Sequence, residues 1–363
     1  MTWHIRKTDI PAISLGAKLL SCGGGGDTKS VEALLLSIMN DADEIEVRTI
    51  ADIKNEWIVS VGIMGSTVLF NEDIPSGDEG HQALLTYESV SNRKAEALIS
   101  IEIGGVNALA PLVIAQQTKL PVIDGDGMGR AFPELYMTSF HLNRIPLAPL
   151  SVVTHDHKLA IAADNDAFAS TYQAKEFTVR NGGHSHTIGY GADADQMKTA
   201  MLPGTLNLVY RLGKVIKNEL SINKKLNQLF EMFDNSIYGL PKVILQGVLS
   251  EVNRWFENGA MIGKLVVEGR SAFSNRKVEV EFRNEFISIK ENGYICTAPD
   301  LVLLLNAQNL SPLSVVEVQA GQSVKVLAIS APNVLRTTDM LEYVGPRHYQ
   351  LPCSYKPFNE GGR

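Results

Sequence analysis

Short apolar segments alternate with segments of helical periodicity along the first 150 residues, and this pattern constrains the fold more than any other feature. Buried strands are predicted at Trp57–Met64, Ala97–Ile103 and Lys119–Asp124. Helices are predicted at Asp9–Ser21, Ser30–Met39, His81–Val90 and Ala108–Thr118. Strands that alternate with helices indicate an α/β domain with a mostly parallel sheet. In such sheets, ligands bind at the carboxyl ends of the strands.

The pattern changes twice after this region. Residues 151–163 are predicted as a hairpin, Asp164–Glu176 as a helix and Phe177–Tyr190 as β-like. Gln196–Glu219 is predicted as a helix with a break at Pro203 and Gly204, and Asn223–Ile237 as a further helix. From about Gly247 the chain is rich in short strands, and Asn292-Gly293 marks a hairpin. This even spacing predicts a small barrel or sandwich.

A chain of 363 residues is long enough for two domains. We expect a discontinuous α/β domain made of residues 1–163 and about 191–246. A β domain is expected at about 247–345, with 164–190 as a segment that could join it. Residues 346–363 are expected to form a C-terminal tail.

The charge balance and the cysteines exclude several functional classes. Lysine plus arginine number 33 and aspartate plus glutamate 40, which gives a net charge of −7. A mildly acidic chain without a basic run predicts neither a nucleic-acid partner nor binding to an anionic membrane. Three cysteines without a CxxC pair predict neither a disulfide framework nor a structural zinc site.

The location and assembly of the protein follow from similar arguments. The charged segment Met1–Lys7 has no apolar core of the kind found in signal peptides, and the sparse thiols suit a reducing compartment, so we expect a cytoplasmic protein. The longest apolar runs, such as Leu301–Leu305, are too short to span a bilayer. An apolar, acidic protein of this size is also expected to form a homo-oligomer.

A run of four glycines lies between two predicted helices. Gly23, Gly24, Gly25 and Gly26 are followed by Asp27, which can cap the next helix. Four glycines are entropically unfavourable unless the backbone needs positive φ or a close approach. Their amides can bind an anion, but the spacing matches no nucleotide-binding motif, so no nucleotide cofactor is expected. The alternative is a tight turn between the helices.

A carboxylate ends the second predicted strand. Glu102 lies in an otherwise apolar segment and is followed by Gly104, Gly105 and Asn107. A carboxylate amid apolar residues is unfavourable to bury without a partner, which favours a functional role for Glu102. For Asn107, capping of the next helix and substrate binding are weighed equally.

The third predicted strand ends in a loop with four ionisable side chains and three glycines. Asp124 and Asp126 are two residues apart and therefore project to the same side. Such a pair can bind a divalent cation, or one carboxylate can raise the pKa of the other for acid–base chemistry. Arg130 can bind a carboxylate or carbonyl group of a substrate, with Gly129 and Glu134 beside it. The alternative is an internally salt-bridged loop.

The histidines give a weaker signal. His155 and His157 are predicted at a hairpin tip in solvent. His184 and His186 have the spacing of a metal-ligand pair on one face of a strand, although hydrogen-bonded histidines are the more common outcome. His141 follows the Asp/Arg loop and is a candidate acid or base. Cys22 is a candidate nucleophile, although no histidine partner is visible and a buried thiol is expected.

Four segments resemble the S-methyl-thiohydantoin desulfurase-like family. These are CGGGGD at Cys22–Asp27, IEIGGVN at Ile101–Asn107, LPVIDGDGMGRAFPE at Leu120–Glu134 and AMLPGTL at Ala200–Leu206. Segments beginning at Pro299, Gly321 and Val344 extend the similarity over nearly the whole chain. The resemblance implies a three-layer α/β/α domain joined to a small β-barrel domain. Many relatives carry small or apolar residues at the positions of His184 and His186, so no role is transferred to these histidines.

The resemblance also implies an activity. The family name denotes hydrolytic removal of a methylthio group from a hydantoin-like ring, and its members accompany proteins of the hydantoinase/oxoprolinase group, which are the partners expected here. We therefore expect a hydrolase that acts on a small cyclic amide.

In the expected mechanism, Asp124 or Asp126 activates water, directly or through one divalent metal ion. Arg130 and the amides of Gly23–Gly26 stabilise developing charge, and Glu102 and His141 are second candidates for proton transfer. Asp124, Asp126, His184 and His186 are the candidate metal ligands.

The predicted substrate-binding residues, which come from all three glycine-containing loops, are Gly23, Gly24, Gly25, Gly26, Asp27, Gly104, Gly105, Asn107, Gly129 and Glu134. Two alternatives remain open. One is a non-catalytic protein that binds such a ring or serves as an accessory subunit of a hydantoinase. The other, a nucleotide-dependent enzyme, depends only on the glycine content.

Overall fold

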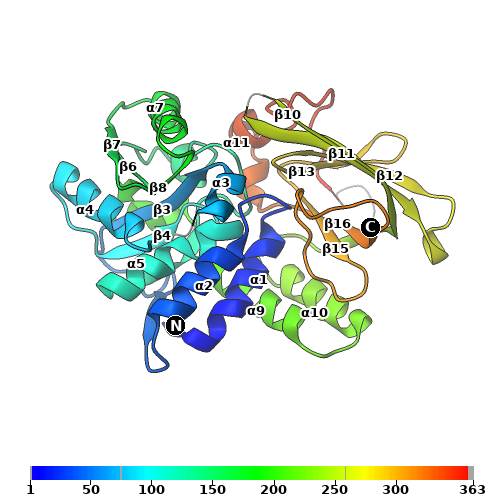
Figure 1. Ribbon diagram of the computed structural model, residues 1–363, viewed down its shortest axis with the longest axis horizontal. Coiled ribbons are helices and arrows are strands. Elements are labelled where there is room, and N and C mark those ends of the chain that lie inside the picture. The colour runs from blue at the N-terminus through cyan, green and yellow to red at the C-terminus, as the bar shows by residue number, and fades with distance from the viewer. Residues whose placement is uncertain (1, 74–75, 258, 359–363) are drawn as a thin grey trace.

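The computed structural model describes residues 2–73, 76–257 and 259–358. The chain forms an α/β part built on one large sheet and a β part built on a second, curled sheet, which lie side by side in Figure 1. The α/β fold with an additional β domain is therefore confirmed. None of the helices in the described ranges is both long and apolar enough to cross a membrane.

The first sheet is mixed, with a parallel centre. Its order is β1-β2-β5-β4-β3-β8-β6-β7, and β9 pairs with β5. The strands are β1 (Trp3–Arg6), β2 (Glu44–Arg48), β3 (Ile58–Gly65), β4 (Ala97–Ser100), β5 (Val122–Asp126), β6 (Leu150–Thr154), β7 (Leu159–Ala162), β8 (His184–Ala192) and β9 (Leu202–Pro203). The pairs β2–β5, β5–β4 and β4–β3 are parallel, whereas the flanking strands pair antiparallel. The carboxyl ends of β3, β4 and β5 therefore share one edge.

Helices cover both faces of this sheet. They are α1 (Ile10–Leu20), α2 (Thr28–Ile38), α3 (Thr67–Glu72), α4 (Glu79–Ser91), α5 (Ala110–Thr118), α6 (Ser139–Leu142), α7 (Ala167–Arg180), α8 (Ala194–Ala200), α9 (Thr205–Lys217) and α10 (Ile222–Asp234), with short 3-10 turns at Lys7–Asp9 and Gly105–Ala108. On β8, Ser185 hydrogen-bonds Thr178 of α7, whereas His186 packs against Gly80 of α4. Neighbouring residues of a strand face opposite sides, so α7 and α4 cover opposite faces.

The second sheet is antiparallel and curled, in the order β14-β13-β12-β11-β10-β16-β15. Its strands are β10 (Lys242–Glu257), β11 (Ala260–Gly269), β12 (Lys277–Arg283), β13 (Glu285–Lys290), β14 (Tyr294–Thr297), β15 (Leu301–Asn306) and β16 (Ser323–Ile329). Alternate residues such as Val278, Val280 and Phe282 point into a shared apolar core. The sheet is a half-barrel. The 3-10 turns Ser271–Phe273 and Asn333–Arg336 and the helix α11 (Thr338–Val344) complete the part of the chain that the structure describes.

One local prediction needs correction. The segment Phe177–Arg180 was predicted as β-like, but it completes α7, and β8 starts only at His184. The chain reverses at Gly182 and Gly183, both of which have positive φ, so the glycines separate the end of α7 from the start of β8. The helix is capped by Asp166, whose side chain accepts a hydrogen bond from the Phe168 amide.

The sheets also define where the two parts divide. Residues 164–190, which the sequence left as a segment that could join the β domain, form α7 and most of β8 and so belong to the first sheet. The predicted break at Pro203-Gly204 is present, because α8 ends before β9 and α9 begins after Gly204. Of the predicted tail, residues 359–363 lie outside the described residues.

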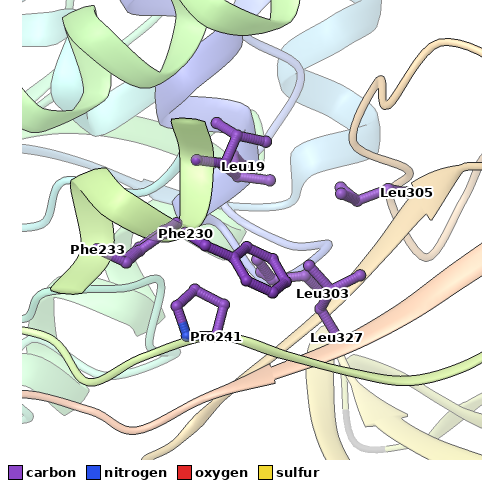
Figure 2. A pocket seen from close by; sticks show the side chains of 8 residues that line it. Leu19, Phe230, Phe233, Pro241, Leu303, Leu305 and Leu327 are labelled. Atoms are coloured by element: carbon purple, nitrogen blue, oxygen red, sulfur yellow. The ribbon is translucent and has the colours of Figure 1, made fainter. Parts of the chain in front are cut away.

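Apolar side chains join the two parts where helices α1 and α10 meet strands β15 and β16. Leu19 of α1, Phe230 and Phe233 of α10, and Leu303 and Leu327 of the second sheet surround a small apolar cavity (Figure 2). The cavity has a volume of about 10 Å³, which is too small for a ligand. This contact therefore serves to hold the α/β and β parts together.

We expect Leu303→Ala to destabilise the whole protein by about 2–5 kcal/mol, because Leu303 is nearly fully buried and its truncation enlarges a cavity that cannot collapse easily. Denaturant unfolding would measure the change. Val179→Ala is the control, since Val179 is exposed on α7 and its truncation should change stability by less than about 0.5 kcal/mol. Equal effects of the two substitutions would contradict this account of the contact.

Candidate functional site

Glu102 is buried just beyond the end of β4 and is held from two sides. Its Oε1 accepts a hydrogen bond from Asn107 Nδ2 at 2.6 Å, and its Oε2 accepts one from the Phe132 amide at 3.1 Å. Burial raises the pKa of Glu102 to about 8, and the nearby charge of Asp126 adds to this rise. A carboxyl group with this pKa can both donate and accept a proton near neutral pH.

Asn107 is fixed by the backbone of β3. Its Oδ1 accepts a hydrogen bond from the Ile63 amide at 2.5 Å, and its Nδ2 donates to the Ile63 carbonyl oxygen at 3.2 Å as well as to Glu102. Of the two roles expected for Asn107, helix capping and substrate binding, the first does not occur, because its side chain caps no helix. The side chain instead orients the Glu102 carboxylate.

The glycine run connects this corner of the α/β part to the β part. The Cys22 carbonyl oxygen accepts a hydrogen bond from the Phe286 amide at 2.7 Å, and the Gly23 carbonyl oxygen accepts one from the Val315 amide at 2.9 Å. On the other side, the Gly25 carbonyl oxygen accepts a hydrogen bond from the Val106 amide at 2.8 Å. The run therefore lies between β13 and the loop that follows β4.

Close backbone contacts explain the glycines. A Cβ atom on Gly105, whose φ is +68°, would lie 1.8 Å from the Gly25 carbonyl oxygen. A Cβ atom on Gly23 would lie 2.4 Å from the Phe286 ring, and one on Gly24 would lie 2.5 Å from Cγ of Glu285. Gly104 faces the Ala131 amide in the same way. The glycines thus bring Glu102 and Glu285 into one buried region.

Glu285, at the start of β13, is the second buried carboxylate of this region. Burial raises its pKa to about 8; the charge of Arg130 opposes this rise, and the Glu102 carboxylate adds to it. Its Oε2 is buried and has no hydrogen-bond partner within the described ranges, and the same holds for the hydroxyl group of Tyr349. Tyr349 is 4% exposed, and Arg130 and Glu285 both influence its pKa. A buried polar atom without a protein partner calls for one from outside the chain, such as an ordered water or a polar ligand, and here two of them lie in one region.

Arg130 is fully buried and faces the β part. Its Nη1 donates to the Asp300 carbonyl oxygen at 2.9 Å, its Nη2 to the Phe286 carbonyl oxygen at 3.1 Å, and its Nε to the Ala131 carbonyl oxygen at 3.2 Å. No carboxylate in the described chain forms an ion pair with it. Arg130 therefore supplies positive charge to the site while its donors hold the two parts together.

Asp124 and Asp126 are engaged by the backbone. Asp126 Oδ2 accepts hydrogen bonds from the amides of Ile103, Met128 and Gly129 at 3.0, 2.9 and 2.6 Å, and burial raises its pKa to about 6. Asp124 Oδ1 accepts a hydrogen bond from the Asn207 amide in the first turn of α9, and burial raises its pKa. The two carboxylates thus organise the Asp/Arg loop and the start of α9.

The other predicted residues lie in separate surroundings. Asp27 caps α2 by accepting a hydrogen bond from the Lys29 amide, and Glu134 forms an ion pair with Lys175 of α7. His141 packs against the rings of Tyr136, Phe168 and Tyr343, and burial lowers its pKa. Burial raises the pKa of the Cys22 thiol to about 11, which keeps the thiol neutral and weakly nucleophilic.

The candidate metal ligands do not share one centre. His184 Nε2 lies 2.7 Å from Asp73 Oδ2, and His186 lies against Gly80, while β4 and β3 separate both histidines from Asp124 and Asp126 on β5. Within the part of the chain that the structure describes, no group of three or more His, Cys, Asp or Glu side chains is arranged to hold a metal ion. The residues predicted as ligands therefore do not fit a metal site, and no catalytic step is derived through one.

The sequence did not indicate Glu285, which the fold brings near Glu102 from about 180 residues away along the chain, or Tyr349, which lies near Glu285 and Arg130. Neither residue lies in a glycine-rich loop, and the charged stretch Arg276–Glu285 alternates charged and apolar residues in the manner of an ordinary half-exposed strand. Only the position of Glu285 at the start of an otherwise apolar strand, FISIK, resembles the signal that singled out Glu102.

Comparisons with known proteins agree with this architecture. A crystal structure of a protein from Chromobacterium violaceum is similar, with a TM-score of 0.82 and 18% sequence identity over 98% of this chain and 100% of that one. That likeness concerns the fold. No curated protein matches the chain. Residues 8–164 match the S-Me-THD-like N-terminal domain, and residues 165–358 match the S-Me-THD-like C-terminal domain. The protein therefore belongs to the S-Me-THD-like family.

Proposed function

We propose that this protein is a hydrolase that removes the methylthio group from an S-methyl-thiohydantoin or a closely related cyclic amide. Membership of the S-Me-THD-like family supports a role related to thiohydantoins. The observation that carries the chemistry is the pair of buried glutamates, Glu102 and Glu285, each with a pKa of about 8, at the junction of the two domains.

In the proposed mechanism one glutamate acts as the general base and the other as the general acid. With both pKa values near 8, both carboxyl groups are mostly protonated at pH 7, and the reactive form, in which one member holds a proton and the other is ionised, gains population as the pH approaches 8. The ionised carboxylate takes a proton from water, and the water oxygen forms a bond to the ring carbon that carries sulfur. The C–S bond then breaks, the protonated carboxyl group gives its proton to the leaving sulfur, and methanethiol and a hydantoin result.

Arg130 and Asn107 support the two glutamates without touching the reacting atoms. The Arg130 charge favours the ionised state of the pair and thereby opposes the effect of burial. Asn107 holds Oε1 of Glu102 in place. Of the residues predicted from sequence, Glu102 thus moves from second candidate to principal acid or base. Asp124 and Asp126 become residues that shape the loop.

The first test replaces each glutamate by glutamine. We expect Glu102→Gln and Glu285→Gln each to lower the turnover of S-methyl-thiohydantoin by about 100-fold or more, because each change removes one proton-transfer group. Methanethiol release would be measured. Glu279→Gln is the matched control from the same sheet, since Glu279 pairs with Lys264 on the outer face and should leave turnover unchanged.

Three outcomes would separate the alternatives. Normal turnover in both variants would remove the glutamates from the mechanism. Saturable binding of the ring by the unaltered protein without methanethiol release would contradict the hydrolase and support a binding protein. Release only in the presence of a hydantoinase would support the accessory subunit.

The raised pKa values also predict a pH dependence of stability. In the unfolded chain a glutamate ionises near pH 4.5, whereas Glu102 and Glu285 ionise near pH 8 in the folded protein. Between these limits the folded state binds more protons than the unfolded state, so the free energy of unfolding must fall as pH rises. We expect a fall of about 1.4 kcal/mol per pH unit for each proton retained, between pH 6.5 and 8.

Urea unfolding at pH 6.5, 7.25 and 8 would measure this slope. In the double variant Glu102→Gln/Glu285→Gln the slope over this range should largely disappear. An equal slope in the unaltered protein and the double variant would show that these two groups do not retain the protons. His186, whose pKa burial lowers to about 4, contributes an opposite slope near pH 6.5, where the unfolded chain still binds its proton, and the comparison with the double variant cancels this contribution because both proteins contain His186.

A further inference from the structure

A group of charged side chains from three segments lies beside the glutamate pair. Lys175 of α7 forms an ion pair with Glu134 of the Asp/Arg loop. His348 follows α11 and packs edge-on against the Tyr349 ring, with centroids 5.2 Å apart. The charges of Lys175, Arg283 and Glu134 all act on the His348 imidazole, so these four groups lie close together. We call Lys175, Arg283, Glu134 and His348 the charged rim.

Arg283 is placed by its register in the second sheet. It is the last residue of β12 and lies directly opposite Glu285 across the β12–β13 turn. Residues opposite each other in an antiparallel pair project to the same face, so Arg283 shares the face of Glu285. The Arg283 side chain is half-buried, and within the described residues it makes no hydrogen bond or ion pair. Its guanidinium group is thus available to a ligand held at Glu285.

The charged rim has an excess of positive charge. Lys175 and Arg283 carry two positive charges, Glu134 balances one of them, and burial and the two cations keep His348 neutral at pH 7. One positive charge therefore remains at the rim. Beneath the rim, the Tyr349 hydroxyl group and Glu285 Oε2 are buried and lack protein partners among the described residues. The polar ring of a ligand would lie beside the buried Tyr349 and Glu285, and an anionic substituent on that ring would lie at the charged rim.

We propose that the preferred substrates are cyclic amides whose ring carries a carboxylate substituent on a short alkyl chain, which Arg283 binds with help from Lys175. This inference rests on the proposed function, because it names the substrate class of the same site. Arginine binds a carboxylate through two parallel hydrogen bonds, and such a contact discriminates strongly against a neutral group of the same size. Arg283 would be a specificity residue that touches the substituent and not the reacting carbon.

The experiment compares two rings that differ only in charge. The S-methyl-thiohydantoins derived from aspartate and asparagine carry a carboxymethyl and a carbamoylmethyl group, respectively, and are nearly equal in size. We expect the unaltered protein to show a kcat/KM about 10- to 100-fold higher for the carboxylate compound, the usual range for a charge-assisted pair of hydrogen bonds. Arg283→Gln should remove this preference by lowering kcat/KM for the carboxylate compound far more than for the carboxamide compound.

Lys277→Gln is the matched control. Lys277 lies at the other end of β12, is exposed, and has Glu251 at 3.9 Å as its nearest acid, so its replacement should change neither kcat/KM value. Equal kcat/KM values for the two rings in the unaltered protein would overturn the inference. An equal loss for both rings in Arg283→Gln would also overturn it, because a merely structural arginine would give that result.

The outcomes also separate this inference from the proposed function. Turnover of both rings without preference would contradict the inference alone. If neither ring is turned over, the hydrolase is contradicted, and the inference is then decided by binding. A rise in melting temperature with the carboxylate ring, absent with the carboxamide ring and lost in Arg283→Gln, would support it; equal shifts with both rings would overturn it.

Discussion

The buried guanidinium group of Arg130 is the interaction on which the site and the domain arrangement both depend. A fully buried charge is unfavourable unless its donors are satisfied, and Arg130 satisfies three of them with carbonyl oxygens, two of which belong to the β part. The β part therefore cannot shift relative to the Asp/Arg loop without leaving this cation unpaired. At the same time, the charge acts on Glu102, Glu285, Tyr349 and Cys22. One side chain thus fixes the geometry of the domain junction and the electrostatics of the carboxylates.

The glycines and aspartates of these loops hold Arg130 in its position at the domain junction. Gly25 and Gly105 let two backbone segments touch, and Asp126 gathers three amides so that the loop bearing Arg130 takes one shape. Asp126 Oδ1 and Glu285 Oε2 are both buried without a hydrogen-bond partner in the described structure, so a free oxygen does not distinguish the two residues. The pKa does: three backbone hydrogen bonds oppose the effect of burial at Asp126, whose pKa rises only to about 6, whereas the pKa of Glu285 rises to about 8. The proposed mechanism gives proton transfer to the glutamates because a carboxylate of higher pKa is the stronger base.

Much of the fold could be predicted from local patterns in the sequence, and the site only in part. The strands Trp57–Met64 and Ala97–Ile103 correspond to β3 and β4, and the hairpin at Asn292-Gly293 is present, because apolar runs and turn residues act locally. Glu102 could be found because a carboxylate in an apolar strand is conspicuous within a few residues. Its partner Glu285 could not, since their proximity depends on how two sheets pack. For the same reason, the charge of Asp124 and Asp126 suggested a catalytic pair, while the amides that engage them became visible only in three dimensions.

The position of the site at a domain junction has a chemical consequence. The carboxyl ends of β4 and β5 supply Glu102 and the Asp/Arg loop, as in other α/β sheets, but this edge alone contains only one of the two glutamates whose pKa rises to about 8. The β part supplies Glu285, and the segment after α11 supplies Tyr349. Burial is what raises both glutamate pKa values. Glu285 of the β part packs against Gly24 of the α/β part, so its burial depends on the contact between the two parts. A separated β part would expose Glu285 to water and return its pKa towards that of an ordinary glutamate, so the acid–base pair is a property of the assembled chain.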